Sequence, residues 1–297
     1  MKVGFIGIGR MGGNMARWIL EAGYDLTVHD LIKENTNHLL EKGSKWADSP
    51  RAVAEGCDVV ISSLPSPAEV EQVVYGPDGL MRGWKSGDIY VDMTTNSHDL
   101  ALQLAEDARA KGVTFLDSPV TGGSKGAEEG NLVFIVGGEK AALDKVTPVL
   151  QTMGHKIYHV GESGSGTVAK LVNNVISITS NAIMAEAFVM GVKAGVDPQT
   201  LWEVATSGTA NNWDLARYPE YVFKGNFEPG FRLSLASKDV GLALQLARKV
   251  GVPASVAAAV DQSYLAAKTA GYGDGSLYSI FRYLEELVGV QVRTTEK

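Results

Sequence analysis

The sequence predicts a doubly wound α/β unit followed by an all-helical unit. Short β-branched runs alternate with amphipathic helical stretches from residue 2 to about residue 160, and such alternation is typical of a parallel sheet with helices on both faces. The alternation stops at GESGSG, residues 161–166, whose glycines and serines favour a turn. No strand is predicted beyond it. We therefore predict two domains, residues 1–162 and residues 163–297.

The first domain contains six runs typical of buried strands. They are KVGFI (2–6), DLTVHD (25–30), VVISSL (59–64), DIYVDM (88–93), VTFLDSPV (113–120) and NLVFIVGG (131–138). Helices are predicted over about 10–23 and 32–42, and helical or loop segments separate the later strands. HKIYHV, residues 155–160, also has the pattern of a strand.

The second domain is predicted to contain only helices. A long helix over about 166–194 joins the two domains, and further helices follow over about 198–206, 235–250, 254–270 and 277–288. Glycines and prolines separate them: Gly195, Pro198, Pro229, Gly251, Pro253 and Gly271.

Composition argues against several classes of partner. With 27 basic and 34 acidic residues the net charge is −7, which disfavours nucleic acid and anionic membranes. The single cysteine, Cys57, allows neither an intramolecular disulfide nor a thiolate metal cluster, and the five histidines are scattered, so no metal site is expected. No export signal is recognised at the start, and a cytoplasmic location is expected.

A glycine motif follows the first predicted strand directly. Gly7, Gly9 and Gly12, with Arg10 and Met11 between them, stand where the helix begins. This context is that of a dinucleotide-binding fingerprint, in which a tight turn brings backbone amides to a pyrophosphate. The alternative is a glycine-rich turn that binds nothing. The motif predicts a Rossmann-type unit.

Asp30 ends the second predicted strand, at the spacing expected for an acid that binds the adenosine ribose hydroxyls. A carboxylate there repels a 2′-phosphate, and the following residues, Leu31 and Ile32, provide no arginine to bind one. The sequence therefore favours NAD over NADP as cofactor.

The helix that opens the second domain carries one stripe of polar residues on an apolar surface. At helical spacing, Lys170, Asn173, Asn174, Ser177 and Asn181 lie within an arc of roughly 100°. The stripe has one charge and several compact hydrogen-bonding groups, which favours the wall of a cleft over a solvated face. The alternative is a surface lysine whose stem covers apolar neighbours. Asn181, farthest along, is expected to be structural.

Three motifs in order resemble those of the β-hydroxyacid dehydrogenase family. They are Asp117–Gly123 (DSPVTGG), Lys170 with Asn173 and Asn174, and Lys238 with Asp239. The family segment reads DAPVSGG, so Ser118 and Thr121 are conservative departures. The resemblance covers essentially the whole chain.

The resemblance implies a set of functional residues. Thr121, Gly122 and Gly123 would bind the substrate carboxylate; Leu64, Pro65 and Thr95 would line the cofactor; and Lys238 would reach towards cofactor and substrate. His98 replaces a proline of the family, which leaves the path of its loop open. Lys238 and Asp239 could instead be an exposed pair early in a helix.

Lys170 is the candidate general acid/base. Oxidation of an alcohol needs a base for the hydroxyl proton as hydride leaves, and the reverse reduction needs an acid. Asn174, one turn further, would hold the substrate oxygen or orient Lys170.

The sequence thus predicts an NAD-dependent oxidoreductase of the 3-hydroxyisobutyrate dehydrogenase type, acting on a small carboxylate. Alternatives are an NADPH-preferring semialdehyde or glyoxylate reductase of the same family and a non-catalytic dinucleotide-binding module. A phosphogluconate-type decarboxylating enzyme is disfavoured, because its lysine is followed by a different run. The apolar helical half predicts a homodimer or homotetramer.

Overall fold

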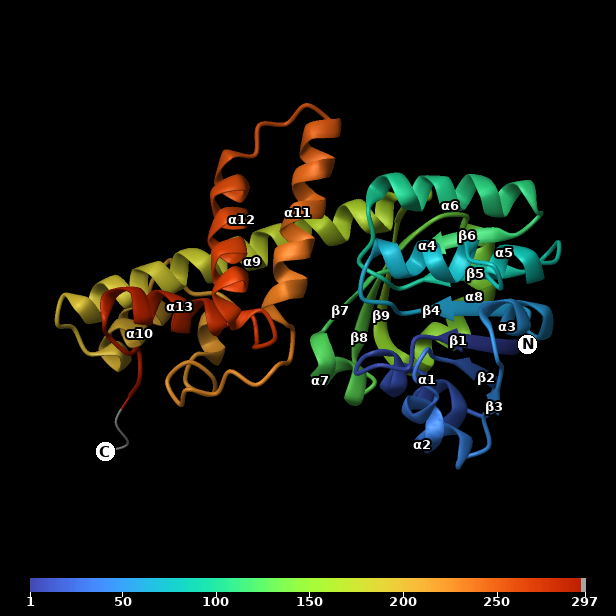
Figure 1. Ribbon diagram of the computed structural model, residues 1–297, viewed down its shortest axis with the longest axis horizontal. Helices are drawn as coiled ribbons and strands as arrows, with labels where there is room; N and C mark the ends of the chain where they lie inside the picture. The colour runs from blue at the N-terminus through green and yellow to red at the C-terminus, as the bar shows by residue number, and fades with distance from the viewer. Residues whose placement is uncertain (295–297) are drawn as a thin grey trace. The chain divides into compact units, whose positions relative to one another are not determined.

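A computed structural model describes residues 1–294, and the chain divides into two compact units, Met1–Lys170 and Leu171–Lys297 (Figure 1). The predicted boundary at residue 162 lies earlier than this division. The difference arises in helix α9, Ser165–Lys193, whose first turn contacts the strands of unit 1. The backbone therefore crosses from unit 1 to unit 2 inside a helix.

Unit 1 is built on one sheet, whose strand order is β3-β2-β1-β4-β5-β6-β8-β7, with β9 paired to β8. The strands are β1 Lys2–Ile6, β2 Asp25–His29, β3 Lys45–Trp46, β4 Val59–Ser62, β5 Ile89–Asp92, β6 Thr114–Asp117, β7 Val120–Thr121, β8 Leu132–Gly137 and β9 Gly154–Gly161. From β1 to β6 every pairing is parallel.

The far edge of the sheet departs from the predicted parallel arrangement, because β8 runs antiparallel to β6 and β7. The connection from β7 to β8, residues 122–131, contains only the short helix α7, Gly123–Glu128. A parallel crossover needs about a dozen residues or more. The chain therefore turns back instead of crossing over.

Alternate residues of each strand enter two different cores, as expected for a sheet covered on both faces. In β1, Phe5 packs on the face covered by α1 and α8, and Ile6 packs on the face covered by α3 to α6. The helices are α1 Gly12–Glu21, η1 Lys33–Thr36, α2 Asn37–Leu40, α3 Pro50–Gly56, α4 Pro67–Tyr75, α5 Leu80–Gly83, α6 His98–Ala110 and α8 Lys140–Met153. The predicted doubly wound fold is confirmed.

Unit 2 is helical, and within residues 171–294 the structure has no strand beyond an isolated bridge between Arg232 and Ser276. After α9 come α10 Pro198–Ser207, η2 Leu215–Arg217, α11 Leu233–Lys249, α12 Ser255–Ala267, η3 Lys268–Tyr272 and α13 Ser279–Val288. The predicted helix over 254–270 ends earlier, because a π-helical turn replaces its last residues and Gly271 breaks it with a φ of +98°. Tyr218 is wholly buried in the core, where it meets the rings of Phe188 and Phe281 edge-on.

Helix α9 is long and apolar enough to cross a membrane by length and composition alone. The same composition is typical of the central helix of a packed domain, because both environments exclude water from apolar side chains. Three of its polar residues, Asn174, Ser177 and Asn181, hydrogen-bond to side chains of other helices and loops in unit 2. This side of α9 therefore packs against protein.

Candidate active site

The three motif glycines occupy three different environments in the loop between β1 and α1. Gly7 has a φ of +90°, and a Cβ there would lie 2.4 Å from the Ser63 carbonyl oxygen. A Cβ on Gly12 would lie 1.8 Å from the Gly7 carbonyl oxygen, so the turn and the helix start are in direct contact. Gly9 has nothing within 4 Å of such a Cβ. An open, exposed backbone at the start of a helix suits a pyrophosphate.

Asp30 follows β2 and is tied to this loop by its carboxylate. Oδ2 accepts the Ile8 amide at 2.6 Å, while Oδ1 accepts the Ile32 amide at 2.8 Å and the Asn35 side-chain amide at 3.1 Å. Leu31 beside it is 93% exposed. The carboxylate is thus fixed next to the glycine loop, where an adenosine ribose would be expected.

A buried carboxylate, Asp92, organises the loops that contain the other predicted cofactor residues. Its Oδ1 accepts the Ser62 hydroxyl at 2.8 Å and the Thr94 amide at 3.1 Å. The Thr94 hydroxyl accepts the Leu64 amide at 3.0 Å. Burial raises the pKa of Asp92, and these hydrogen bonds oppose the rise. The network brings together the loop of Leu64 and Pro65 and the loop of Thr95, both at the carboxyl ends of strands.

The segment Thr121–Gly123 connects β7 to helix α7. Gly122 and Gly123 have φ values of +124° and +64°, which favour glycine at both positions. Both glycines are exposed. At the other end of α7, the Trp18 indole donates to the Ala127 carbonyl at 3.1 Å and Arg17 donates to the Glu128 carbonyl at 2.8 Å. Helix α1 therefore holds α7.

Asp117 ends β6, is the first residue of the DSPVTGG segment, and is 2% exposed. Its Oδ1 accepts the Gly164 amide at 2.7 Å, and its Oδ2 accepts the Thr167 amide at 2.6 Å. Burial raises the pKa of Asp117 to about 6, against the effect of these two bonds. The carboxylate thus caps the amino end of α9.

Lys170 lies in the second turn of α9 and is the last residue of unit 1. It is 9% exposed, whereas a surface lysine whose stem covers apolar neighbours would hold its ammonium in water. Asn174 follows four residues later on the same helix, and therefore one turn away on the same face.

Asn174 belongs to a polar group inside unit 2. Its amide nitrogen donates to Asp239 Oδ2 at 2.6 Å, and its oxygen accepts the Asn173 amide at 3.1 Å. The Lys238 ammonium, on α11, pairs with Asp239 Oδ1 at 3.0 Å. Asp239 is 2% exposed. The alternative that Lys238 and Asp239 form an exposed pair is therefore wrong for Asp239, whose carboxylate is buried.

Comparison with known proteins gives matches over both units. Residues 2–161 match the family model described as the NAD binding domain of 6-phosphogluconate dehydrogenase, and residues 164–284 match the one described as NAD-binding of NADP-dependent 3-hydroxyisobutyrate dehydrogenase. 2-(Hydroxymethyl)glutarate dehydrogenase of Eubacterium barkeri is 35% identical over 98% of this chain and 97% of that protein. The chain belongs to the β-hydroxyacid dehydrogenase family.

Other members of the β-hydroxyacid dehydrogenase family agree in sequence and in fold. 3-Hydroxyisobutyrate dehydrogenase of Pseudomonas aeruginosa is 40% identical, over 84% of this chain and 86% of that protein. The solved structure of Mycobacterium tuberculosis 3-hydroxyisobutyrate dehydrogenase with L-serine is 30% identical, with a TM-score of 0.87 over 95% of this chain and 98% of that one. The predicted family is confirmed, and unit 1 is its NAD(P)-binding domain.

The structure changes the interpretation of the polar stripe on α9. Ser177 donates to the buried Asp214 at 3.0 Å, and Asn181 donates to the Tyr264 hydroxyl at 3.0 Å. Asn181 is wholly buried, as expected for a structural residue. Asn174, Ser177 and Asn181 thus all have partners inside unit 2, while the substrate-binding role of Asn174 stays a prediction.

Sequence reasoning gave no role to Asp92 or Asp117, although a signal for both was present. The strands VHD, YVD and FLD all end in aspartate, at Asp30, Asp92 and Asp117. Carboxyl ends of parallel strands meet at one edge of a sheet, where loops present unpaired amides. In the structure, all three carboxylates accept backbone amides of neighbouring loops or helix starts.

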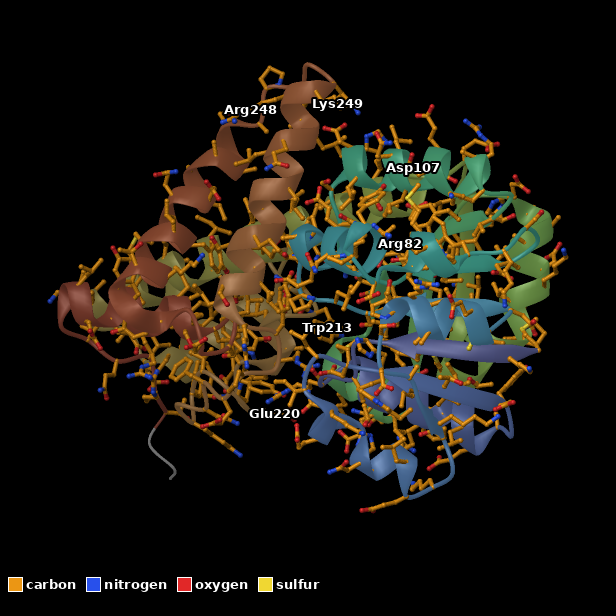
Figure 2. All side chains as sticks on the ribbon, turned by 45° about the vertical axis from the view of Figure 1, so that its right-hand side comes forward. Arg82, Asp107, Trp213, Glu220, Arg248 and Lys249 are labelled. Carbon is orange, nitrogen blue, oxygen red and sulfur yellow. The ribbon has the colours of Figure 1, made fainter. Side chains whose placement is uncertain are left out.

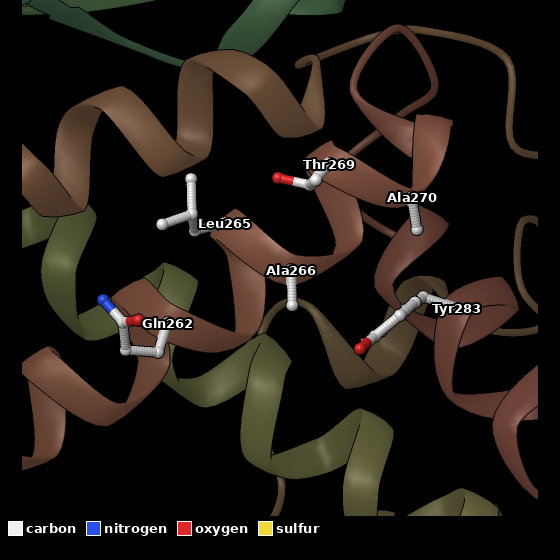
Figure 3. A pocket seen from close by; sticks show the side chains of 6 residues that line it. All are labelled: Gln262, Leu265, Ala266, Thr269, Ala270 and Tyr283. Atoms are coloured by element: carbon white, nitrogen blue, oxygen red, sulfur yellow. The ribbon is translucent and has the colours of Figure 1, made fainter.

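Other surface features of unit 2 lie apart from the motif residues. Trp213 is 67% exposed (Figure 2). The Arg217 guanidinium lies over its ring, 4.4 Å from the centroid. A hollow of about 450 Å³ between α12, η3 and α13 is lined by Gln262, Leu265, Ala266, Thr269, Ala270 and Tyr283 (Figure 3). It contains none of the predicted site residues. Within residues 1–294, no three His, Cys, Asp or Glu side chains form a group that could hold a metal ion.

Proposed function

We propose that this protein is an NAD-linked oxidoreductase that interconverts a small β-hydroxyacid and its semialdehyde, as a 3-hydroxyisobutyrate dehydrogenase does. The observation that supports this most strongly is Lys170. It is a buried lysine one turn before Asn174, in a chain that matches dehydrogenases of this family along nearly its whole length.

The chemistry proposed for Lys170 is proton transfer. The nicotinamide supplies the hydride acceptor or donor, and the protein must supply the proton partner. During oxidation Lys170 Nζ accepts the hydroxyl proton, and during reduction it returns a proton to the carbonyl oxygen. Asn174 is proposed to orient this group. Its amide keeps one N–H and one lone pair beyond the bonds to Asp239 and Asn173.

NAD is the proposed cofactor, and Asp30 is the reason. Its carboxylate is held beside the glycine loop by three hydrogen bonds. A ribose hydroxyl can donate to the remaining lone pair of Oδ2, whereas a 2′-phosphate would meet a fixed negative charge. Gly7, Gly9, Arg10, Met11 and Gly12 would hold the pyrophosphate, and Leu64, Pro65, Thr95 and Lys238 would surround the rest of the cofactor.

The proposed substrate is a small carboxylate bound by Thr121, Gly122 and Gly123. A hydroxyl and the amides of two exposed glycines at the start of a short helix form a compact group of donors for an anion. The positive φ values of Gly122 and Gly123 direct successive amides in a way that a substituted residue would rarely allow.

A cytoplasmic homodimer or homotetramer is proposed as the working form. Support comes from large apolar side chains on the outer face of α9: Val172, Ile176, Ile183 and Met190 are each more than half exposed. An apolar row of this kind on a helix is typical of a surface that another protein surface covers.

Lys170→Ala tests the mechanism. We expect turnover of a β-hydroxyacid to be lost while NAD binding, measured by titration calorimetry, is retained. Lys193→Ala is the matched control, since Lys193 ends the same helix and donates to the Val288 carbonyl. The substrate panel is hydroxyisobutyrate, glycerate, hydroxybutyrate, serine and hydroxymethylglutarate, with NAD and with NADP.

Three results would contradict parts of the proposal. Wild-type turnover in Lys170→Ala would exclude the lysine as acid/base. Faster turnover with NADP would exclude the cofactor preference. Binding of NAD without turnover of any panel member would favour a non-catalytic dinucleotide-binding module.

A further inference from the structure

We propose that Asp117 is a positioning residue that fixes the first turn of α9 against the end of β6 and so sets the position of Lys170. The proposal rests on the acid/base role proposed for Lys170. It assigns a task to a carboxylate that lies in the DSPVTGG segment but outside the three residues expected to bind substrate.

The hydrogen bonds of Asp117 bridge two points of one helix start. Gly164 precedes α9, and Thr167 is in its first turn, yet both amides donate to the same carboxylate, at 2.7 and 2.6 Å. The first amides of a helix have no partner within the helix. Here their acceptor comes from a strand about 50 residues earlier in the chain, so the cap ties the helix to the sheet.

The joint around Asp117 leaves no room for the helix start to slide. A Cβ on Gly166 would lie 2.5 Å from the carbonyl oxygens of both Asp117 and Ile135. A Cβ on Gly137 would lie 2.5 Å from Asp117 Oδ1 and 2.7 Å from the Gly166 amide nitrogen. Two glycines thus let the backbones of β8 and α9 meet at the carboxylate.

Lys170 follows Thr167 by three residues, less than one helical turn. A displacement of the first turn therefore moves Lys170 by a similar amount, because a helix transmits it rigidly over so short a span. All of these residues lie in unit 1. Proton transfer requires the donor and acceptor atoms within hydrogen-bond distance, so a small displacement is costly.

Ionisation of Asp117 matters for this task. Burial raises the pKa of Asp117 to about 6, so at neutral pH the carboxylate is mainly ionised and both oxygens accept. An asparagine of the same shape offers one acceptor oxygen and turns an N–H towards the other amide. Asp117→Asn should therefore release one of the two anchoring points.

The experiment compares Asp117→Asn with Asp88→Asn. Asp88 also accepts a backbone amide, that of Lys85 at 2.8 Å, and burial also raises its pKa. It differs in position, because it lies at the amino end of β5, whereas Asp117 lies at the carboxyl end of β6. We expect kcat of Asp117→Asn to fall by about 10- to 100-fold, with NAD affinity and binding stoichiometry unchanged. Hydrogen exchange of residues 164–170 should accelerate. Asp88→Asn should behave as wild type in each measurement.

Gly166→Ala provides a second variant that keeps the carboxylate but crowds the joint; it should show the same loss of kcat and the same faster exchange. A merely structural Asp117 would instead lower Tm and the number of NAD-binding molecules together with kcat. Wild-type exchange of residues 164–170 in Asp117→Asn would overturn the proposal, as would wild-type kcat when Lys170→Ala is inactive. If wild-type protein turns over no substrate, the proposed function fails and the exchange data alone decide the role of Asp117.

Discussion

Gly9 and Gly12 have different surroundings, and each position therefore favours glycine for a different physical reason. Space around Gly9 is open, whereas a Cβ on Gly12 would collide with the Gly7 carbonyl oxygen at 1.8 Å. The sequence motif treats the two alike. Only the surroundings of each show that Gly12 is required by the close contact, and that Gly9 leaves space for the proposed ligand.

Alanine substitutions separate these two roles. Gly9→Ala should keep the wild-type Tm but weaken NAD binding by about tenfold or more, a loss of roughly 1.4 kcal/mol, because its methyl group projects where the pyrophosphate approaches. Gly12→Ala should lower stability by about 1–3 kcal/mol through overpacking. Calorimetry of unfolding and NAD titration check both. A lower Tm in Gly9→Ala would contradict the open environment.

The raised pKa of Asp117 predicts how the free energy of unfolding changes with pH. Its pKa is raised from 3.8 in the unfolded chain to about 6 in the folded protein, so the proton is bound more tightly when the protein is folded. The stabilising contribution is complete below pH 3.8 and is lost as pH rises through about 6. A pKa difference of this size between the folded and unfolded protein changes the free energy of unfolding by about 3 kcal/mol in total.

Urea unfolding between pH 4 and pH 7.5 measures this effect. Wild type should lose about 2.4 kcal/mol relative to Asp117→Asn across this range, since other buried carboxyls such as Asp92 and Asp214 titrate in both proteins. Parallel stability curves would show that Asp117 has an ordinary pKa. If the predicted loss is observed, the ionised Asp117 carboxylate lowers the free energy of unfolding at neutral pH while it holds the first turn of α9.

Among the elements, α1 and α7 form a unit that the sequence pattern does not reveal. Trp18 and Arg17 of α1 bind the last carbonyls of α7, and Gly130 packs beneath the indole ring, where a Cβ would lie 2.9 Å away. Helix α1 begins at the cofactor loop and α7 begins at Gly123. One helix thus supports the proposed cofactor and substrate loops together.

Trp18→Phe removes the indole donor but keeps an aromatic ring above Gly130. Loss of one hydrogen bond of about 1 kcal/mol should raise KM for the hydroxyacid by about fivefold, while NAD affinity stays at the wild-type value. Hydrogen exchange of residues 123–130 should become faster. Unchanged exchange there would show that the indole bond does not hold α7.

Secondary structure was predictable where the hydrophobic period is strong. Strands β1, β2, β4, β5 and β6 and the main helices of unit 2 were expected within a few residues, because a buried face imposes a period of 2 or 3.6 on the sequence. The short β3, the antiparallel β8 and the π-turn after α12 were not. Their conformations depend on neighbouring strands, loop length and Gly271, and not on a local pattern.

For the whole molecule, the outer face of α9 predicts self-association. Burying an apolar side chain contributes about 1.5–3 kcal/mol, and an unpaired carboxylate in the same place costs more than that. Ile183, 57% exposed, is the test position. Ile183→Glu should shift the protein from dimer or tetramer towards monomer in light scattering. Leu102→Glu, on α6 and 40% exposed, is the control and should leave the mass unchanged.

A monomeric wild type would contradict this assembly, and so would an Ile183→Glu variant of unchanged mass. In either case the apolar row on α9 would have another explanation. The proposed chemistry of Lys170 would stand, since each residue assigned to it lies in a single chain.

The sequence by itself determined the fold class, the two-part organisation, the family and the residues that its motifs share, because hydrophobic period and motif spacing are properties of neighbours along the chain. Tertiary structure decided where Asp92 and Asp117 direct their carboxylates, which glycine faces open space, and which residues of the α9 stripe are satisfied inside unit 2. Each of these depends on atoms from segments far apart in the chain. No local pattern encodes such contacts.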